Sequence, residues 1–227
     1  MIIAIDGPAG SGKTTIAQAV AARHGLTYLD TGAMYRAVTL LALERGVSLD
    51  DDDVLGALAF DMDLQFGTGA DGVSRVLLSG RDVTDQIRTQ AVSQKVSFVA
   101  AHRKVRDALT LRQRKAAVTG NVVLEGRDIG TVVCPHADVK IYLVASVEVR
   151  ARRRALQLEE QGICISAKTL ERELLLRDSH DSGRALAPLK KAREAVQIDT
   201  SDKTVNEVVE AIVSLAAGVG TREDASC

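Results

Sequence analysis

The 227-residue sequence contains no tryptophan and only three phenylalanines and three tyrosines. Proteins that bind single-stranded nucleic acids stack bases on aromatic side chains, so this composition argues against that class. The formal net charge is -1, which provides no overall basic field to attract a long polyanion. We therefore expect no nucleic-acid partner.

Cysteine is also scarce. Cys134, Cys164 and Cys227 are far apart and form no C-x-x-C pair, which argues against a disulfide framework and against a zinc site. Reduced thiols in a cytoplasmic protein are the expectation. No apolar run is long enough to span a bilayer, and no charged leader precedes the first apolar residues, so we expect no membrane segment and no signal peptide.

The strongest motif lies in the first fifteen residues. Residues 1–6 form a short apolar run with three isoleucines, which predicts a buried strand. Gly7-Pro8-Ala9-Gly10-Ser11-Gly12-Lys13-Thr14 follows and matches G-x-x-x-x-G-K-[ST] at every fixed position. The apolar residues after it have the spacing of a helix packed on a sheet: Ile16, Ala17, Val20 and Ala21.

Strand, glycine loop and helix together are the context in which this motif binds a nucleoside triphosphate. The N–H groups of the loop and of a helix that starts at Lys13 point at phosphate oxygens. Lys13 supplies positive charge to the β- and γ-phosphates, and the Thr14 hydroxyl is a ligand for Mg²⁺. We therefore predict a nucleoside triphosphate as co-substrate and Mg²⁺ as cofactor; a glycine-rich turn without a ligand is the alternative. The predicted ATP-binding residues of this segment are Gly7, Pro8, Ala9, Gly10, Ser11, Gly12, Lys13, Thr14 and Thr15.

The remaining pattern predicts an α/β protein with a P-loop NTPase fold. Five apolar segments predict a five-stranded parallel sheet flanked by helices: 1–6, 26–29, 122–124, 139–144 and 196–199. Three shorter segments separated by glycine-rich turns predict an antiparallel insert: 63–66, 75–78 and 82–83. Helices are predicted over 89–101, 103–117, 148–161 and 168–181.

Several boundaries follow from local signals. We expect Thr31 to cap the helix that carries Met34 and Val38 on its apolar face, and Ser201 or Asp202 to cap a final helix through Leu215. The acidic run 50–53 is interpreted as a helix start. The predicted organisation is one domain over 1–220, with a monophosphate-binding region at about 58–118, a helical lid at about 148–186 and a flexible tail at 221–227.

Polar residues at the carboxyl ends of predicted strands indicate a site along one edge of the sheet. Asp30-Thr31-Gly32 and Glu125-Gly126-Arg127-Asp128 both occupy such positions. In the second lid helix Arg177, Asp181 and Arg184 are spaced to share one face, and a surface ion-pair ladder is the alternative for them.

The arginines indicate which phosphate chemistry is involved. The two asparagines, Asn121 and Asn206, are followed by Val and Glu, so the Asn-Lys-x-Asp motif of switch GTPases is absent. Transfer of a phosphoryl group to a second anion requires fixed positive charge, which guanidinium groups provide. The residues themselves therefore favour a small-molecule kinase with an anionic acceptor, without identifying that acceptor.

Four segments resemble those of bacterial-type cytidylate kinases, and the resemblance covers nearly the whole chain. They are residues 5–13, 29–36, 87–90 (Ile-Arg-Thr-Gln) and 125–133 (Glu-Gly-Arg-Asp-Ile-Gly-Thr-Val-Val), of which the last two are more specific than the phosphate loop. The predicted insert also resembles the one that distinguishes this family from shorter nucleoside monophosphate kinases. The resemblance implies ATP-dependent phosphorylation of CMP and dCMP to their diphosphates. We separately expect the protein to be a monomer.

The resemblance also implies how the acceptor is recognised. Thr31, Arg36 and Arg127 are expected to bind its monophosphate. Cytosine offers an N4 donor beside N3 and O2 acceptors, so a carboxylate and an arginine are able to read its edge. The residues expected to face the cytosine ring are Ser97, Arg106 and Asp128.

In the lid, the resemblance implies that Arg177 and Arg184 contact phosphates, that Asp181 contacts the sugar and that Arg153 lies on the ATP side. The predicted catalytic residues are Lys13, Arg127, Arg177 and Arg184.

Three positions depart from the family pattern. Glu125 stands where many members have Asp, Cys134 replaces a commonly aromatic residue, and Thr31 stands where some members have Ser. Two other interpretations remain open. One is a P-loop kinase for a sugar or a shikimate-like acid. The other is a nucleotide-dependent binding module with negligible turnover.

Overall fold

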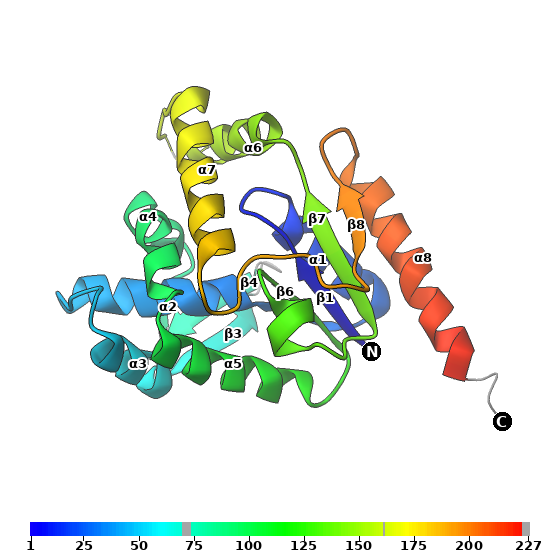
Figure 1. Cartoon of the computed structure of the whole chain (residues 1–227), viewed down its shortest axis with the longest axis horizontal. Coiled ribbons are helices and arrows are strands. Elements are labelled where there is room, and N and C mark those ends of the chain that lie inside the picture. The colour runs from blue at the N-terminus through cyan, green and yellow to red at the C-terminus, as the bar shows by residue number, and fades with distance from the viewer. Residues whose placement is uncertain (70–73, 161, 224–227) are drawn as a thin grey trace. The chain divides into compact units, whose positions relative to one another are not determined.

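Strand β1 (Ile2–Asp6) is the middle strand of a five-stranded sheet with the order β2-β6-β1-β7-β8 (Figure 1). It pairs in parallel with β6 (Val122–Gly126), where Ile3 lies opposite Val123, and with β7 (Val139–Val144), where Ile5 lies opposite Ile141. The computed structural model describes residues 1–69, 74–160 and 162–223. The predicted five-stranded parallel sheet is confirmed.

The chain divides into two compact units. Unit 1 comprises Met1–Leu29 and Ala117–Cys227, and unit 2 comprises Asp30–Ala116. Besides β1, β6 and β7, unit 1 contains α1 (Lys13–His24), β2 (Thr27–Asp30, whose last residue belongs to unit 2), a π-helical turn (Ile129–Val133), α6 (Val147–Glu159), α7 (Ala167–Gly183), β8 (Val196–Asp199) and α8 (Val205–Glu223).

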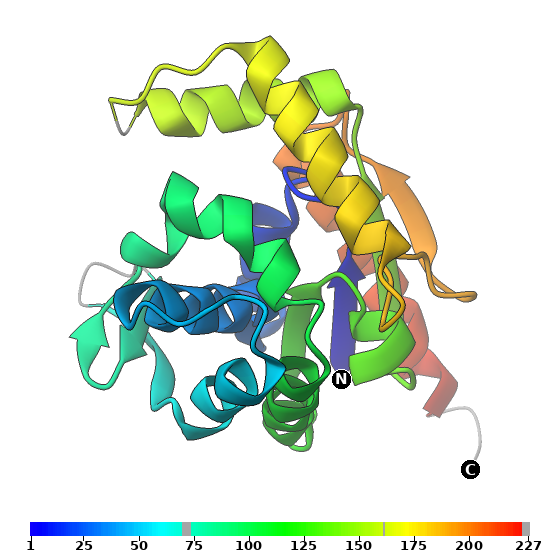
Figure 2. The same cartoon turned by 60° about the vertical axis from the view of Figure 1, so that its left-hand side comes forward.

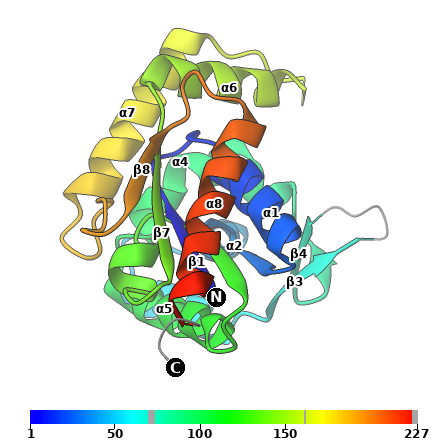
Figure 3. The same ribbon diagram turned by 90° about the vertical axis from the view of Figure 1, so that its right-hand side faces the viewer.

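Apolar side chains of α1 and α8 form the main core of unit 1 against one face of the sheet. Ile16 and Val20 of α1 and Ile212 of α8 are buried with the strand residues Ile5 and Ile141. Figure 3 shows the two helices side by side over the strands. A second, smaller core joins α6 to α7.

Unit 2 combines helices with the predicted antiparallel insert. Its elements are α2 (Thr31–Glu44), α3 (Asp52–Asp61), β3 (Leu64–Thr68), β4 (Ser74–Leu78), β5 (Arg81–Asp82), a 3₁₀ turn (Gln86–Arg88), α4 (Gln90–Val99) and α5 (Arg103–Ala117). The three strands form an antiparallel sheet in the order β3-β4-β5. Within this unit α2 lies beside α3 and α4 (Figure 2).

Two predicted helix caps are wrong. Asp30 caps α2, because its Oδ1 accepts the Ala33 N–H at 2.9 Å and Thr31 is already helical. At α8 Thr204 and Glu207 form a reciprocal capping box, in which the Thr204 N–H donates to Glu207 Oε2 at 2.8 Å and the Glu207 N–H to Thr204 Oγ1 at 3.3 Å. Ser201 instead accepts the Ser146 N–H.

The ends of two helices also differ from expectation. The helix α7 ends at Gly183, and Arg184 has an extended backbone with φ -66° and ψ 142°, so Arg184 does not share a helix face with Arg177 and Asp181. The helix α8 continues past Leu215 to Glu223. Residues 70–73 of the predicted hairpin turn, Gln161 at the expected end of α6, and residues 224–227, where a flexible tail is predicted and Cys227 lies, fall outside the described residues.

None of the described helices is both long and apolar enough to cross a bilayer.

Candidate active site

The loop between β1 and α1 has a backbone that two of its glycines make possible. Gly7 has φ 153°, and a Cβ added there would lie 2.2 Å from the Leu143 carbonyl oxygen of β7. Gly12 precedes α1 in the left-handed region with φ 89° and provides no side-chain cap. The first N–H groups of α1 therefore receive no side-chain cap from Gly12.

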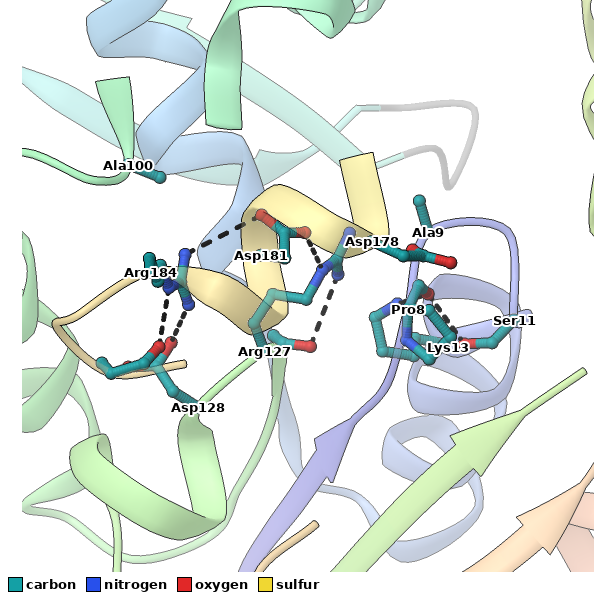
Figure 4. Close-up of polar contacts among 12 residues, drawn as sticks. Pro8, Ala9, Ser11, Lys13, Ala100, Arg127, Asp128, Asp178, Asp181 and Arg184 are labelled. Carbon is teal, nitrogen blue, oxygen red and sulfur yellow. Dashed lines mark hydrogen bonds and ion pairs between the residues drawn. The ribbon is translucent and has the colours of Figure 1, made fainter. Parts of the chain in front are cut away.

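The side chain of Lys13 folds back across this loop. Its Nζ donates to the Pro8 carbonyl oxygen at 2.7 Å, and Ser11 Oγ donates to the same oxygen at 3.0 Å (Figure 4). Only 7% of Lys13 is exposed. Burial, followed by repulsion from Arg127 and Arg177, lowers the pKa of Lys13 to about 7. Three cationic side chains of unit 1 thus act on one another, which favours binding of an anion among them.

Two arginines of α6 hold the loop through its backbone carbonyls. Arg150 Nη1 donates to Ala9 O at 3.1 Å and lies 2.7 Å from Asp178 Oδ2 of α7. Arg153 Nη1 lies 3.5 Å from Gly10 O and donates to Thr200 Oγ1 at 3.0 Å. Sequence reasoning selected Arg153 but missed Arg150, because four arginines of this helix carry no signal that distinguishes them.

Four predicted residues of unit 1 meet in one network of ion pairs (Figure 4). Arg127 Nε donates to Asp181 Oδ2 at 3.0 Å. Arg184 Nη1 lies 3.9 Å from Asp181 Oδ1, and its Nη2 lies 3.6 Å from Asp128 Oδ1. Burial opposes ionisation of Asp181, but Arg127, Arg177 and Arg184 outweigh it and lower the pKa of this carboxyl. The surface-ladder alternative does not describe these residues, because both carboxylates are buried.

Arg177 adds a further positive group to this region. Its Nε is buried and has no hydrogen-bond partner among the described residues. Burial and the neighbouring Arg127 lower its pKa to about 10. A guanidinium whose buried Nε–H has no partner among the described residues is suited to a phosphate oxygen, since an unpaired buried donor is unfavourable.

Two carboxylates at the carboxyl ends of β1 and β6 were not selected as site residues. Asp6 accepts the N–H groups of Ile129 and Gly130, both at 2.8 Å. Burial raises the pKa of Asp6 to about 6, although these two bonds act in the opposite direction. Glu125 is buried, and its Oε1 accepts the Tyr28 hydroxyl at 2.5 Å. Asp6 is a polar residue at the carboxyl end of a predicted strand, and this position in the sequence was the signal that could have selected it.

Unit 2 carries the other four predicted acceptor residues. Arg36 Nη1 donates to Ile87 O at 3.0 Å and to Ser93 Oγ at 2.9 Å. Thr31 is buried at the start of α2. Arg106 is also buried; it donates to Ala100 O at 3.1 Å.

Arg106 lies over an aromatic ring, with its Cζ 5.4 Å from the centroid of Tyr35. This arrangement orients the guanidinium and is itself favourable. Ser97 Oγ, on α4 of the same unit, is buried and has no hydrogen-bond partner among the described residues.

The residues present are compatible with a magnesium ion. Thr14 is half-buried in the first turn of α1, so its hydroxyl is at the helix end that the glycine loop precedes. Mg²⁺ is usually held by few protein oxygens together with substrate phosphates and water. No cluster of three or more His, Cys, Asp or Glu side chains suited to a metal occurs in residues 1–69, 74–160 and 162–223.

A glycine loop at the carboxyl end of β1, with lysine and arginine converging in the same α/β unit, defines a P-loop kinase. Structural similarity agrees at the level of fold: a gluconokinase from Sinorhizobium meliloti 1021 matches with a TM-score of 0.51 and 15% identity over 99% of this chain and 97% of that one. The model of the family "Cytidylate kinase" matches residues 3–217. The chain belongs to the cytidylate kinase family.

Curated relatives agree with this assignment. A cytidylate kinase from Exiguobacterium sibiricum is 48% identical over 216 residues, which are 95% of this chain and 96% of the relative. A cytidylate kinase from Bacillus licheniformis is 47% identical over 95% of both chains. The family predicted from the four sequence segments is confirmed.

Proposed function

We propose that this protein transfers the γ-phosphoryl group of ATP to CMP and dCMP, giving CDP and dCDP, as a cytoplasmic and monomeric enzyme of pyrimidine nucleotide metabolism. The observation that supports it best is the mutual effect of Lys13, Arg127 and Arg177, since like charges that act on one another within one unit favour a polyanionic ligand. Family membership supports CMP over a sugar or a shikimate-like acid as acceptor.

The reaction forms a bond from an oxygen of the CMP phosphate to the γ-phosphorus and breaks the bond from that phosphorus to the β,γ-bridging oxygen. Charge spreads over the three equatorial oxygens in the transition state. Lys13 and the arginines neutralise it without reorganisation of solvent. Lys13 exchanges its bond to Pro8 O for phosphate oxygens. The remaining catalytic residues in this proposal are Arg127, Arg177 and Arg184.

The phosphate loop, residues 7–15, binds ATP, and Arg153 supports it through Gly10 and Thr200. The Thr14 hydroxyl would hold Mg²⁺ together with the phosphates. When bound, the ion adds positive charge beside the leaving oxygens.

On the acceptor side, the monophosphate is bound by Thr31, Arg36 and Arg127. Asp181 binds the sugar, and Arg184 binds phosphate. The base-reading residues in this proposal are Ser97, Arg106 and Asp128. A carboxylate at position 128 favours cytosine, because uracil replaces the N4 donor with an acceptor.

The test is ADP release with a panel of nucleoside monophosphates. We expect CMP and dCMP to be the best acceptors, and Asp128→Ala to reduce the preference for CMP over UMP while the KM for ATP stays within about threefold. Equal rates with AMP, GMP and CMP would refute the base-reading part. Single-turnover kinetics separate the binding-module alternative, because such a module retains ATP when CMP is added.

A second test separates the two substrates. We expect Lys13→Ala to lower kcat by about two orders of magnitude or more, and to leave the Kd for CMP measured by calorimetry largely unchanged. Loss of both together would contradict the division of roles.

A further inference from the structure

We propose that Asp6, a residue with no assigned role in the reaction, is a positioning residue for the acceptor side of the site. Its carboxylate accepts the Ile129 N–H through Oδ1 and the Gly130 N–H through Oδ2, both at 2.8 Å. The residue is 3% exposed and lies directly before the phosphate loop. This inference rests on the proposed function.

The two N–H groups belong to the first turn of a helix that has no acceptor of its own for them. Residues 129–133 form a π-helical turn, and its N-cap residue Asp128 makes no side-chain cap hydrogen bond. The first N–H groups of any helix lack an internal partner, and burial makes that lack unfavourable. Asp6 satisfies two of them from a strand that is 123 residues away in sequence.

The π-helical turn also fixes the position of the Asp128 backbone. The Val132 and Val133 N–H groups both donate to the Asp128 carbonyl oxygen, at 2.9 and 3.1 Å. Asp128 and the preceding Arg127 are the acceptor residues that leave β6 at this point. Asp6 thus holds the turn, and the turn holds the residue that reads the base.

The anchor itself is rigid. Asp6 pairs in the sheet with Gly126 of β6 on one side and Tyr142 of β7 on the other. The next residue, Gly7, has no free space toward the Leu143 carbonyl oxygen. Because its backbone is held on both sides, the Asp6 carboxylate fixes the position of the 129–133 turn, and of the acceptor residues before it, relative to the phosphate loop.

Asp6→Asn tests this role, because asparagine keeps the shape but has one acceptor oxygen for two N–H donors. We expect the KM for CMP to rise about 10-fold and the selectivity for CMP over UMP to fall about fivefold, with the KM for ATP and the Mg²⁺ requirement changed less than threefold. Asp138→Asn is the matched control. Asp138 accepts the Ile2 N–H at the opposite end of the same strand and is exposed, so its kinetics should equal those of the wild type.

Asp6→Glu provides a second variant that keeps the charge and both acceptor oxygens of the buried carboxylate. Its extra methylene moves these oxygens away from positions where they accept the Ile129 and Gly130 N–H groups at 2.8 Å, so an effect in the same direction is expected. This variant decides the question if Asp6→Asn does not fold.

A change in the KM for ATP or in the Mg²⁺ requirement as large as that for CMP would place Asp6 on the donor side and overturn the proposal. A lower melting temperature with unchanged kinetics would make the residue purely structural and also overturn it. Wild-type protein measured in parallel shows whether CMP is phosphorylated at all, so a failure of the proposed function is recognised independently.

Discussion

Replacing Gly7 with alanine should inactivate the enzyme while leaving most of its fold in place. The added Cβ would lie 2.2 Å from the Leu143 carbonyl oxygen, more than 1 Å inside the 3.4 Å at which ordinary contact begins. Leu143 is fully buried in β7, which pairs with β1 and β8, so this oxygen has no room to move. The loop must move instead.

The size of the effect follows from that displacement. A shift of about 1 Å in a group that positions a substrate reduces catalysis by about 100-fold. The φ of 153° at Gly7 is nearly restricted to glycine and adds about 1–3 kcal/mol of strain. We therefore expect kcat/KM for ATP to fall at least about 100-fold, while CMP still binds.

Gly25→Ala is the matched control. Gly25 also has a positive φ of 64°, but it follows α1 and no atom lies within 4 Å of an added Cβ. This substitution should cost about 1 kcal/mol of stability, a few degrees in melting temperature, and leave the kinetics unchanged. Steady-state kinetics and thermal denaturation of both variants check the argument, and a Gly7→Ala enzyme within threefold of the wild type would refute it.

Two further predictions concern charge. Because the pKa of Lys13 is about 7 in the free protein and bound phosphates favour its protonated form, ATP binding must take up a proton above that pH. We expect the Kd for ATP to rise about tenfold per pH unit above 7, and Lys13→Arg, which stays protonated, to remove this pH dependence. Calorimetry in buffers of different ionisation enthalpy would detect the proton that is taken up. Equal pH dependence of the Kd in the wild type and in Lys13→Arg would contradict the prediction. Asp181→Asn leaves Arg127 and Arg184 without their shared carboxylate, so the free energy of unfolding in urea should fall by about 3 kcal/mol, and an unchanged value would contradict the buried network.

Local sequence determined the phosphate loop and most secondary structure. The residues of the loop are contiguous, and their conformation depends on glycines that tolerate φ values such as 89° at Gly12. The spacing of apolar residues predicted the buried strands and helices, because this spacing is also a local property of the sequence. Local sequence did not determine the helix ends, since Asp30 and Thr31 are both good caps and only the actual start of α2 distinguishes them.

The relations among distant residues were decided by the tertiary structure. Arg127 and Asp181 are 54 residues apart, and Asp6 and Ile129 are 123 apart, so no spacing rule connects either pair. The pairing of β1 with β6 brings Asp6 to the turn at Ile129, and the position of α7 brings Asp181 to Arg127. Sequence alone thus specified a phosphate-binding segment and the residue types for acceptor chemistry. Which side chains share an ion pair or a buried N–H was decided by tertiary packing, because such contacts depend on three-dimensional proximity that local chain geometry does not encode.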